Sequence, residues 1–430
     1  MHSADQIYQY FRDYPHISTD TRKIIPDSLF FALRGETFNG NDYAHEALRK
    51  GAVFAVIDDP SLTSDPRCLL VENALVTLQR IARIHRDQFN IPVIAITGTN
   101  GKTTTKELTA NILATKYPII ATEGNLNNHI GVPLTLLRLT PETRIALIEM
   151  GANHPGEIDF LCQITRPGFG LITNIGRAHL EGFGGFEGVM ATKTELYRFL
   201  ANHQGKVFLH QDDRLLTTLA ENLEKITYGT SPGDCTGFGI TAKPFIALDI
   251  AFKPSGSLHL ETQLYGQYNV PNILAASCIG NYFEVEIPRM KAALEKYNPG
   301  NNRSQVIRTE KNLVVMDAYN ANPTSMAAAL ESFAATDYPR KILILGDMLE
   351  LGDAADEEHE HILQRIHDSG FDEVFLVGPV FTRVNRERKN ICFDDVALAG
   401  LWLEHHPPSD STLLIKGSRG IRLENLLQWL

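Results

Sequence analysis

The sequence predicts an α/β protein of three domains, in which strands alternate with helices along most of the chain. Short apolar runs rich in Val, Ile and Leu recur between helical patterns, which is typical of doubly wound, mostly parallel sheets covered by helices. One apolar run leads directly into a glycine-bounded polar loop and a helix, and turn-forming segments precede Pro92 and occupy residues 298–302. The 430 residues allow roughly three domains. We therefore expect domains over residues 1–88, 89–299 and 300–430.

Composition and charge exclude several classes of function. The chain is 43% hydrophobic and has a formal net charge of −11, which disfavours binding to nucleic acid or to anionic membranes. Its five cysteines show no CxxC spacing, so neither a disulfide framework nor a thiolate zinc site is predicted. The N-terminus has no basic segment followed by an apolar core, and no apolar run approaches the ~18 residues that a bilayer requires. We expect a cytoplasmic monomer that binds no membrane and no nucleic acid.

The N-terminal domain is predicted to be a small α/β unit. Its pattern favours helices over 4–12, 43–50 and 74–89 and strands over 28–33 and 52–57. Polar side chains and a glycine lie around the ends of these strands: Ser18, Thr19, Asp20, Arg22, Arg34 and Gly35. Such groups hold phosphorylated or nucleotide-linked ligands through forked hydrogen bonds, and they also make helix caps and turns. The residues alone leave both interpretations open.

A phosphate loop opens the central domain. A buried strand ending near Ile96 breaks at Gly98, and the chain runs through Thr99, Asn100 and Gly101 into a helix that starts Lys102, Thr103, Thr104. Glycines let backbone N–H groups approach an anion, and a helix N-terminus adds unpaired donors. Lys102 is expected to reach the β- and γ-phosphates of a nucleotide, with the Thr103 hydroxyl facing Mg²⁺. Ile96 stands where the general pattern has a glycine, so this loop is shorter than the common form. An ordinary strand-to-helix turn is the alternative.

The next two candidate groups follow this loop along the chain. Asn127 and Asn128 lie in a polar, glycine-bounded loop, which presents amides to a substrate or only makes turns. A strand over 144–150 carries Glu149 near its end. Because open α/β sheets bind ligands beyond the carboxyl ends of their strands, this carboxylate is expected to reach a metal bound to the phosphates.

The rest of the central domain holds three more polar candidates. A strand over 169–174 leads into a loop with His179, which is either a metal ligand or an ordinary loop histidine. Lys193 lies in a helix, where a solvated lysine is the simpler interpretation. Asn272 precedes the apolar helix 273–282 and fits an N-cap.

The C-terminal domain repeats the strand and helix alternation in a Rossmann-like pattern. We expect strands over 313–316, 341–345, 373–377 and 412–415. Polar loops follow three of them and begin at Asp317, Gly346 and Lys416, so they should converge at the carboxyl edge of one parallel sheet. The acidic and histidine-rich segment 356–361 has residue types that bind metals, but His359 and His361 do not share a helix face, so a solvated helix start is the favoured interpretation.

The motifs in their order resemble those of the Mur ligases over nearly the whole chain. They are the loop Gly98 to Thr105, GNLNNHIGVPLTLL, IEMGANHPGEI, HLEGFG, ATKTELY, YNVPN, Arg303, DAYNANPTSM, GDMLELG and KGSR. Within the family, the sequence motifs of the third domain are similar to those of members that add D-alanyl-D-alanine to UDP-N-acetylmuramoyl-tripeptide. The resemblance implies an ATP-dependent carbon–nitrogen ligase of cell-wall peptidoglycan synthesis that works through an acyl phosphate.

The resemblance also implies roles for individual residues. ATP contacts are implied for Gly98, Thr99, Asn100, Gly101, Lys102, Thr103, Thr104, Asn272, Arg303, Asp317 and Asn320. Two Mg²⁺ sites are implied at Thr103, Glu149, His179 and Lys193, with Lys193 carbamylated by CO₂, and catalysis at Lys102, Glu149, His179 and Lys193. Substrate contacts are implied for Ser18, Thr19, Asp20, Arg22, Arg34, Gly35, Asn127, Asn128, Asp347, Lys416, Ser418 and Arg419. Tyr268 stands where relatives commonly have a histidine, so it receives no role.

Two alternatives compete with this interpretation. One is a sister ligase that adds a single amino acid, or folylpolyglutamate synthase, against which the GDMLELG and YNANPTSM segments argue. The other is a non-catalytic module that uses the phosphate loop as a switch. Glu149, His179 and Lys193 favour chemistry over a switch.

Overall fold

The computed structural model describes residues 1–254, 256–385 and 390–430. The chain divides into two compact units. The first comprises Met1–Ile96, Tyr117–Ala152 and Gly156–Phe169, and the second comprises Thr97–Lys116, Asn153–Pro155 and Gly170–Leu430. The three-domain boundaries expected from the sequence stay a prediction.

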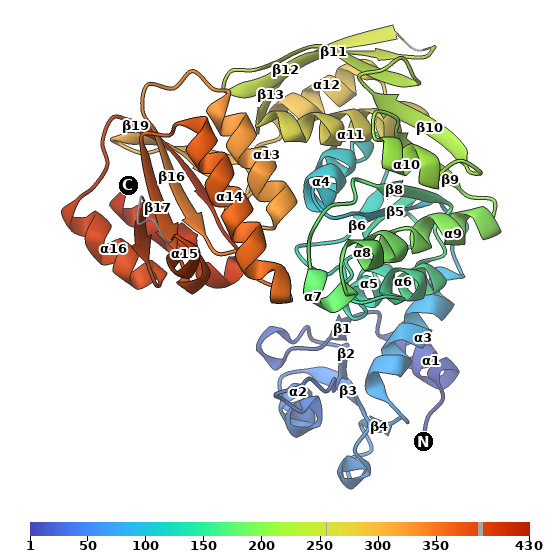
Figure 1. Ribbon diagram of the computed structural model, residues 1–430. Helices are drawn as coiled ribbons and strands as arrows, with labels where there is room; N and C mark the ends of the chain where they lie inside the picture. The colour runs from blue at the N-terminus through green and yellow to red at the C-terminus, as the bar shows by residue number, and fades with distance from the viewer. Residues whose placement is uncertain (255, 386–389) are drawn as a thin grey trace. The chain divides into compact units, whose positions relative to one another are not determined.

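The first unit contains two groups of parallel strands with helices beside them (Figure 1). Strands β1 to β4 pair in chain order, and β7 pairs with both β5 and β6. The elements are α1 (Ala4–Asp13), β1 (Ile17–Ser18), β2 (Ser28–Phe31), α2 (Ala44–Arg49), β3 (Ala52–Ile57), β4 (Cys68–Leu70), α3 (Ala74–Arg86), β5 (Val93–Thr97), β6 (Ile119–Ala121), α5 (Gly131–Leu136), β7 (Ile145–Glu149) and α6 (Glu157–Thr165).

Local sequence explains where the helices of this unit begin. Ser3 caps α1 in a capping box with Gln6, and the Asn73 side chain accepts from the Val76 N–H at the start of α3. Each cap satisfies an N–H group that has no partner inside its helix. Apolar residues of α2 then pack on β2 and β3 in one buried cluster. The predicted helices and strands of this region are confirmed, with shorter ends for α3 and β2.

The second unit begins with α4, which follows the phosphate loop, and continues from β8 to the C-terminus. Its elements up to residue 296 are α4 (Lys102–Leu113), β8 (Phe169–Ile172), α7 (Leu180–Phe183), α8 (Phe186–Lys193), α9 (Glu195–Asn202), β9 (Lys206–His210), α10 (Arg214–Leu219), β10 (Glu224–Gly229), β11 (Cys235–Ala242), β12 (Phe245–Phe252), β13 (Gly256–Tyr265), α11 (Val270–Tyr282) and α12 (Ile287–Lys296). Strand β8 starts at Phe169, the last residue of the first unit.

Three consecutive antiparallel strands interrupt the expected alternation of strands and helices. Strand β12 pairs antiparallel with β11 and with β13, with no helix between them. Buried residues alternate with partly exposed ones along β12, beginning at Ile246 and Leu248, and along β13 at Leu258 and Leu260. This period of two is the signature of a sheet with one buried face. The expected helix after every strand is therefore wrong between residues 235 and 265.

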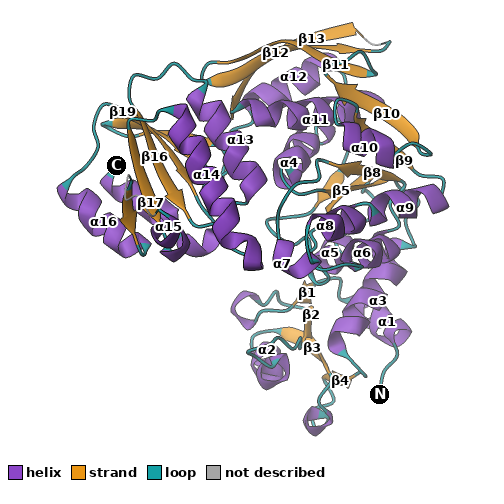
Figure 2. Ribbon diagram, viewed as in Figure 1, coloured by secondary structure: helices purple, strands orange, loops and turns teal. Residues whose placement is uncertain are grey.

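The C-terminal part of this unit is a doubly wound sheet with helices on both faces (Figure 2). The strand order is β14-β15-β19-β16-β17-β18, and only β14 runs antiparallel to its neighbour. The elements are β14 (Gln305–Arg308), β15 (Asn312–Met316), α13 (Pro323–Ala334), β16 (Lys341–Gly346), α14 (Ala355–Ser369), β17 (Glu373–Val377), α15 (Pro379–Val384), β18 (Ile391–Phe393), α16 (Val396–His405), β19 (Ser411–Lys416) and the 3-10 helix η7 (Leu423–Trp429). The predicted parallel α/β class is confirmed here.

Successive side chains of the central strands point to opposite faces of the sheet and pack with different helices. Leu343 and Leu345 pack with α13, α14 and α15, whereas Ile342 and Ile344 pack with α16 and η7. A central parallel strand buried on both faces needs apolar residues at every position. This requirement explains the continuous apolar run ILIL at residues 342–345 of β16.

Three local expectations change in the structure. Asn272 lies inside α11, whose N-cap is Asn269, so the predicted N-cap is wrong. Helix α14 does start in the acidic segment, but His359 is fully buried there and accepts a hydrogen bond from the Met348 N–H at 3.0 Å. Lys193 is 3% exposed, which excludes the solvated interpretation. No helix among the described residues is both long and apolar enough to span a membrane.

A half-buried histidine is expected to make the first unit sensitive to acid. His85 of α3 lies 2.9 Å from the Leu139 carbonyl through Nε2 and 3.0 Å from the Tyr8 hydroxyl through Nδ1. A carbonyl only accepts, so Nε2 carries the proton of the neutral ring and Nδ1 is the acceptor. Burial lowers the pKa of His85, against a smaller opposing effect of the Leu139 hydrogen bond. The stability that neutral His85 contributes is present above the ordinary histidine pKa and is lost as pH falls through the lowered value.

We therefore expect the urea midpoint of the wild-type protein to fall between pH 7.5 and pH 5.5, and to fall less in His85→Gln. Burial also lowers the pKa of His210 and His359, so part of the acid sensitivity remains in the variant. Replacement of the exposed His405 by Gln is the control and should leave the wild-type pH dependence unchanged. Equal pH dependence in all three proteins contradicts this account.

A buried ion pair holds the carboxyl edge of the C-terminal sheet. Lys416 Nζ, at the end of β19, lies 2.6 Å from Asp317 Oδ2 beyond β15, with 3% and 14% of the two side chains exposed. Removing one partner of such a pair leaves a buried charge without compensation, which costs about 3–5 kcal/mol. Asp317→Ala should lower the free energy of unfolding, measured by urea denaturation, by about 3 kcal/mol. Glu331→Ala breaks the exposed pair with Arg365 and should cost less than about 1 kcal/mol; similar losses contradict the prediction.

Candidate nucleotide site

Two glycines allow the loop after β5 to pack closely on its neighbours. Gly98 has φ 132°, and a Cβ there would lie 2.1 Å from Thr173 Oγ1. Gly101 has φ 81°, and a Cβ there would lie 2.5 Å from Asn272 Oδ1. Both backbone conformations favour glycine, and neither position has room for a side chain. The predicted strand, loop and helix arrangement is therefore present.

The segment after β8 holds the backbone of this loop. The Thr99 N–H donates to the Asn174 carbonyl at 2.9 Å, and the Asn100 N–H donates to Asn174 Oδ1 at 3.0 Å. The Asn100 carbonyl accepts from Asn174 Nδ2 at 3.0 Å and from Thr173 Oγ1 at 2.6 Å. Sequence reasoning missed both supporting residues. Their position could have identified them, because both are polar and directly follow the buried strand β8.

The loop lysine folds back over the loop itself. Lys102 Nζ donates to the carbonyls of Gly98 at 2.7 Å and Thr99 at 2.9 Å. Thr103 and Thr104 follow in the first turn of α4, and both are buried. The helix N-terminus thus lies directly beside the lysine amine, an arrangement suited to a phosphate group.

A reciprocal amide pair joins the loop to helix α13. Asn100 Nδ2 donates to Asn322 Oδ1 at 3.3 Å, and Asn322 Nδ2 donates to Asn100 Oδ1 at 2.8 Å. Asn322 is also the N-cap of α13, where its side chain accepts from the Ser325 N–H. The sequence predicted that Asn322 lies in a polar loop, but not that it contacts the phosphate loop.

Within the first unit, Glu149 is held by an amide from the predicted substrate loop. Asn127 Nδ2 donates to Glu149 Oε1 at 2.8 Å, and Glu149 is 2% exposed at the end of β7. Glu149 pairs with Ile96 of β5, two residues before Gly98. Asn128 has a different contact, because its Oδ1 accepts from the N–H groups of Ile130 and Gly131 and caps the turn before α5.

His179 and Lys193 of the second unit contact other groups. His179 begins α7 with φ 52° and forms an ion pair with Glu350 through Nδ1. This hydrogen bond lowers the pKa of Glu350, against the opposing effect of burial. Lys193 ends α8 with its Nζ 5.4 Å from the centre of the Phe183 ring. Among the described residues, no group of three or more His, Cys, Asp or Glu side chains could hold a metal ion.

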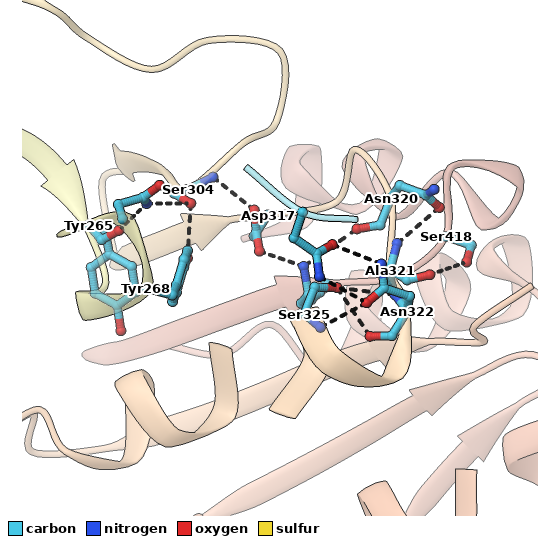
Figure 3. A network of polar contacts seen from close by, with 12 residues as sticks. Tyr265, Tyr268, Ser304, Asp317, Asn320, Ala321, Asn322, Ser325 and Ser418 are labelled. Atoms are coloured by element: carbon cyan, nitrogen blue, oxygen red, sulfur yellow. Dashed lines mark hydrogen bonds and ion pairs between the residues drawn. The ribbon is translucent and has the colours of Figure 1, made fainter. Parts of the chain in front are cut away.

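The three polar loops of the C-terminal sheet converge, as the strand order predicts. Lys416 contacts Asp317, and the Ser418 hydroxyl donates to the Ala321 carbonyl at 3.2 Å (Figure 3). The Ser418 hydroxyl also accepts from the Leu349 N–H at 2.9 Å. Asp347 is fully buried and accepts from two N–H groups at the start of α15. Of the positions predicted to meet an amine substrate, Asp347, Lys416 and Ser418 are buried in internal contacts, and Arg419 is exposed.

Two guanidinium groups lie against one tyrosine ring beside these loops. The Arg303 guanidinium carbon is 3.6 Å from the centre of the Tyr319 ring, and that of Arg419 is 5.1 Å from it. Tyr319 thereby restricts both side chains through cation–π contacts. Sequence reasoning predicted both arginines but missed the tyrosine between Asp317 and Asn320.

The predicted residues of the N-terminal domain form two separate local groups. Arg22 binds Asp20 through both carboxylate oxygens and lowers the pKa of Asp20 to about 2. Arg34 Nε donates to Asp58 Oδ1 at 2.8 Å, and Asp58 also accepts from Asn41 Nδ2 at 2.8 Å. Asp58 was not predicted, and it fixes one side of the Arg34 guanidinium while half of that side chain stays exposed.

The remaining predicted residues of this domain act within turns. The Ser18 hydroxyl lies 3.3 Å from the carbonyls of Asp20 and Lys23. The Gly35 N–H donates to the Phe38 carbonyl, and a Cβ at Gly35 would lie 2.3 Å from the Phe38 ring. Thr19 is partly exposed beside them.

Comparison with known proteins identifies the family. The Mur ligase family catalytic domain matches residues 13–97, the Mur ligase middle domain matches residues 96–280, and the Mur ligase glutamate ligase domain matches residues 302–419. The UDP-N-acetylmuramoyl-tripeptide–D-alanyl-D-alanine ligase of Bacillus subtilis (strain 168) is 33% identical to this chain over 434 residues, which cover 96% of this chain and 92% of the relative.

Solved structures agree with the sequence comparison. A crystal structure of MurF from Acinetobacter baumannii superposes with a TM-score of 0.88 at 30% identity and covers 99% of this chain and 98% of its own. The structure of MurF ligase from Thermotoga maritima in complex with ADP superposes with a TM-score of 0.84 at 28% identity and covers 96% of each chain. With its three matched domains, its glycine-bounded loop after β5 and these full-length relatives, the chain belongs to the Mur ligase family.

Proposed function

We propose that this chain ligates D-alanyl-D-alanine to UDP-N-acetylmuramoyl-tripeptide at the expense of ATP, giving the UDP-linked pentapeptide of peptidoglycan synthesis, ADP and phosphate. The observation that carries the proposal is the full-length similarity, at 33% identity, to a relative named for this reaction. The ADP complex of a structural relative supports ATP as the nucleotide. The converging loops of the second unit are proposed to supply the nucleotide contacts.

The phosphates are proposed to bind at the N-terminus of α4. The backbone N–H groups of Gly98 to Thr104 and the Lys102 amine would face the triphosphate, and Lys102 would exchange its contacts with the Gly98 and Thr99 carbonyls for phosphate oxygens. The remaining nucleotide contacts are assigned to Asn272, Arg303, Asp317 and Asn320. Positive charge at this point offsets the repulsion between an anionic nucleotide and an anionic peptide.

Glu149 and Thr103 are proposed as ligands of one magnesium ion. Glu149 offers a buried carboxylate and Thr103 a hydroxyl, both oxygen ligands of the hard type that Mg²⁺ prefers. When bound, Mg²⁺ supplies positive charge to the phosphate oxygens. Asn127 orients Glu149 by donating to one carboxylate oxygen, as outer ligands commonly do around metals.

A second magnesium ion is proposed at His179 and Lys193. An ammonium group cannot ligate a cation, so Lys193 fits only after its neutral amine attacks CO₂, forms a carbon–nitrogen bond and loses a proton to give an anionic carbamate. His179 would have to release Glu350 to take part. Both residues lie in the same unit, on α7 and α8.

The chemistry proceeds in two steps. The terminal carboxylate of the tripeptide attacks the γ-phosphorus, the bond to the β,γ-bridging oxygen breaks, and ADP leaves. The amine of D-alanyl-D-alanine then attacks the acyl phosphate carbon, loses a proton and expels phosphate. Phosphorylation is needed because an ionised carboxylate is a poor electrophile.

The two ends of the reaction are assigned to different parts of the chain. Ser18, Thr19, Asp20, Arg22, Arg34 and Gly35 are proposed to hold the UDP end, and Asn127 and Asn128 the peptide. Asp347, Lys416, Ser418 and Arg419 are proposed to shape the dipeptide site. In this scheme residues 1–88, 89–299 and 300–430 are the three domains, and the protein works as a cytoplasmic monomer without membrane or nucleic-acid partners.

We expect phosphate release from ATP and Mg²⁺ to require both UDP-N-acetylmuramoyl-tripeptide and D-alanyl-D-alanine. A coupled phosphate assay with each substrate omitted in turn measures this requirement, and D-alanine or L-glutamate in place of the dipeptide tests single-residue addition. Release with neither substrate supports a nucleotide switch instead. Release with a single amino acid supports a sister ligase.

Lys193→Ala should lower kcat by about 100-fold or more, because the amine that forms the carbamate is removed. Short carboxylates such as formate or acetate should restore part of the activity by replacing the missing oxygen donor. Arg198→Ala, on the exposed side of α9, is the matched control and should keep wild-type kcat. Wild-type turnover in Lys193→Ala without added carboxylate contradicts the carbamate role.

A further inference from the structure

A buried serine, Ser304, links two groups of residues that are proposed to contact the nucleotide. Ser304 is 6% exposed and precedes β14. Its Oγ lies 2.9 Å from the Tyr268 hydroxyl and accepts from Asn269 Nδ2 at 3.3 Å (Figure 3). Ser304 has φ 49°, in the left-handed region that non-glycine residues rarely occupy. Such a conformation persists where surrounding contacts hold it.

On one side, hydrogen bonds lead from Ser304 toward the phosphate loop. Asn269 Oδ1 accepts from Asn272 Nδ2 at 2.8 Å. Asn272 Oδ1 accepts in turn from Thr105 Oγ1, on α4, at 3.0 Å. The same Asn272 amide packs against Gly101, where no side chain fits. The position of the amide therefore depends on Asn269, whose Nδ2 is held jointly by Ser304 Oγ and, at 2.9 Å, by the Tyr265 carbonyl.

On the other side, Ser304 binds the carboxylate at the end of β15. Its N–H donates to Asp317 Oδ1 at 2.9 Å, while Asp317 Oδ2 receives Lys416 at 2.6 Å. Each carboxylate oxygen thus has its own donor. Asp317 can rotate only if one of these two bonds breaks.

We infer that Ser304, held by Tyr268 and Asn269, is a positioning residue that fixes Asn272 and Asp317 relative to each other for nucleotide binding. The inference rests on the proposed function for the identity of the nucleotide and for the assignment of Asn272 and Asp317 to its contacts. It gives Tyr268 a role: its hydroxyl completes the hydrogen bonding of Ser304, which is buried, and an unsatisfied polar group is costly where water is largely excluded.

The test compares two tyrosines that differ in their contacts. Tyr268→Phe removes the hydroxyl that meets Ser304. Tyr265→Phe makes the same chemical change three residues away, at a buried hydroxyl that forms no hydrogen bond to any residue described. Calorimetry with ADP and Mg²⁺ gives Kd without requiring ligase turnover, and thermal unfolding gives Tm for the same samples.

We expect Tyr268→Phe to raise the Kd for ADP about fivefold, as the loss of one buried hydrogen bond predicts, while Tyr265→Phe leaves it within twofold. Ser304→Ala should also raise Kd. The double variant Tyr268→Phe/Ser304→Ala should bind ADP no more weakly than the weaker single variant, because both changes remove the same contact. An increase in Kd that is equal in both tyrosine variants, or additive in the double variant, overturns the inference.

The outcome is separable from that of the proposed function. A wild-type protein that binds ADP but fails to join the two proposed substrates refutes the ligase assignment and leaves the ADP comparison valid. A working ligase in which Tyr268→Phe binds ADP like the wild type refutes the positioning role alone. A single cooperative thermal transition well above the temperature of the binding assay shows that each variant is folded, so each result counts for or against the role of Ser304.

Discussion

Close packing of the phosphate loop on the segment after β8 is the constraint on which the nucleotide site depends. The Gly98 backbone touches Thr173, and Asn174 holds the backbone of the next two loop residues. This contact is possible only because position 98 has no Cβ. The loop, the start of α4 and Lys102 follow from it, since a loop displaced outward could not direct its N–H groups to one anion.

Much of the fold could be predicted because its signals are local. The middle parts of buried parallel strands are continuously apolar, as at residues 342–345 of β16 and 413–415 of β19. The polar loops after these strands had to meet at one edge of the sheet. The phosphate loop was recognisable from glycine, lysine and threonine placed directly after β5. The antiparallel strands β12 and β13 also have a local signal, because apolar and polar residues alternate along them. This signal was missed because a helix was expected after every strand.

What could not be predicted depends on contacts between distant positions. Asn100 and Asn322 lie 222 residues apart in sequence, and no local pattern announces that they pair. The burial of Lys193 and His359 is likewise decided by which elements cover them, not by their neighbours along the chain. Asp58, Asn174 and Ser304 support predicted residues without belonging to a motif, and Tyr319 lies in the DAYNANPTSM motif without a predicted role, so only the folded chain identifies what these four residues do.

The reciprocal amides of Asn100 and Asn322 have an electrostatic consequence. Amide groups do not ionise, so this attachment of the loop keeps its strength across pH and is little weakened by added salt. A carboxylate at either position would add a negative charge beside the polyphosphate and make binding of that anion less favourable. These uncharged hydrogen bonds therefore hold the loop in place without reducing the positive electrostatic potential that Lys102 and the N-terminus of α4 produce.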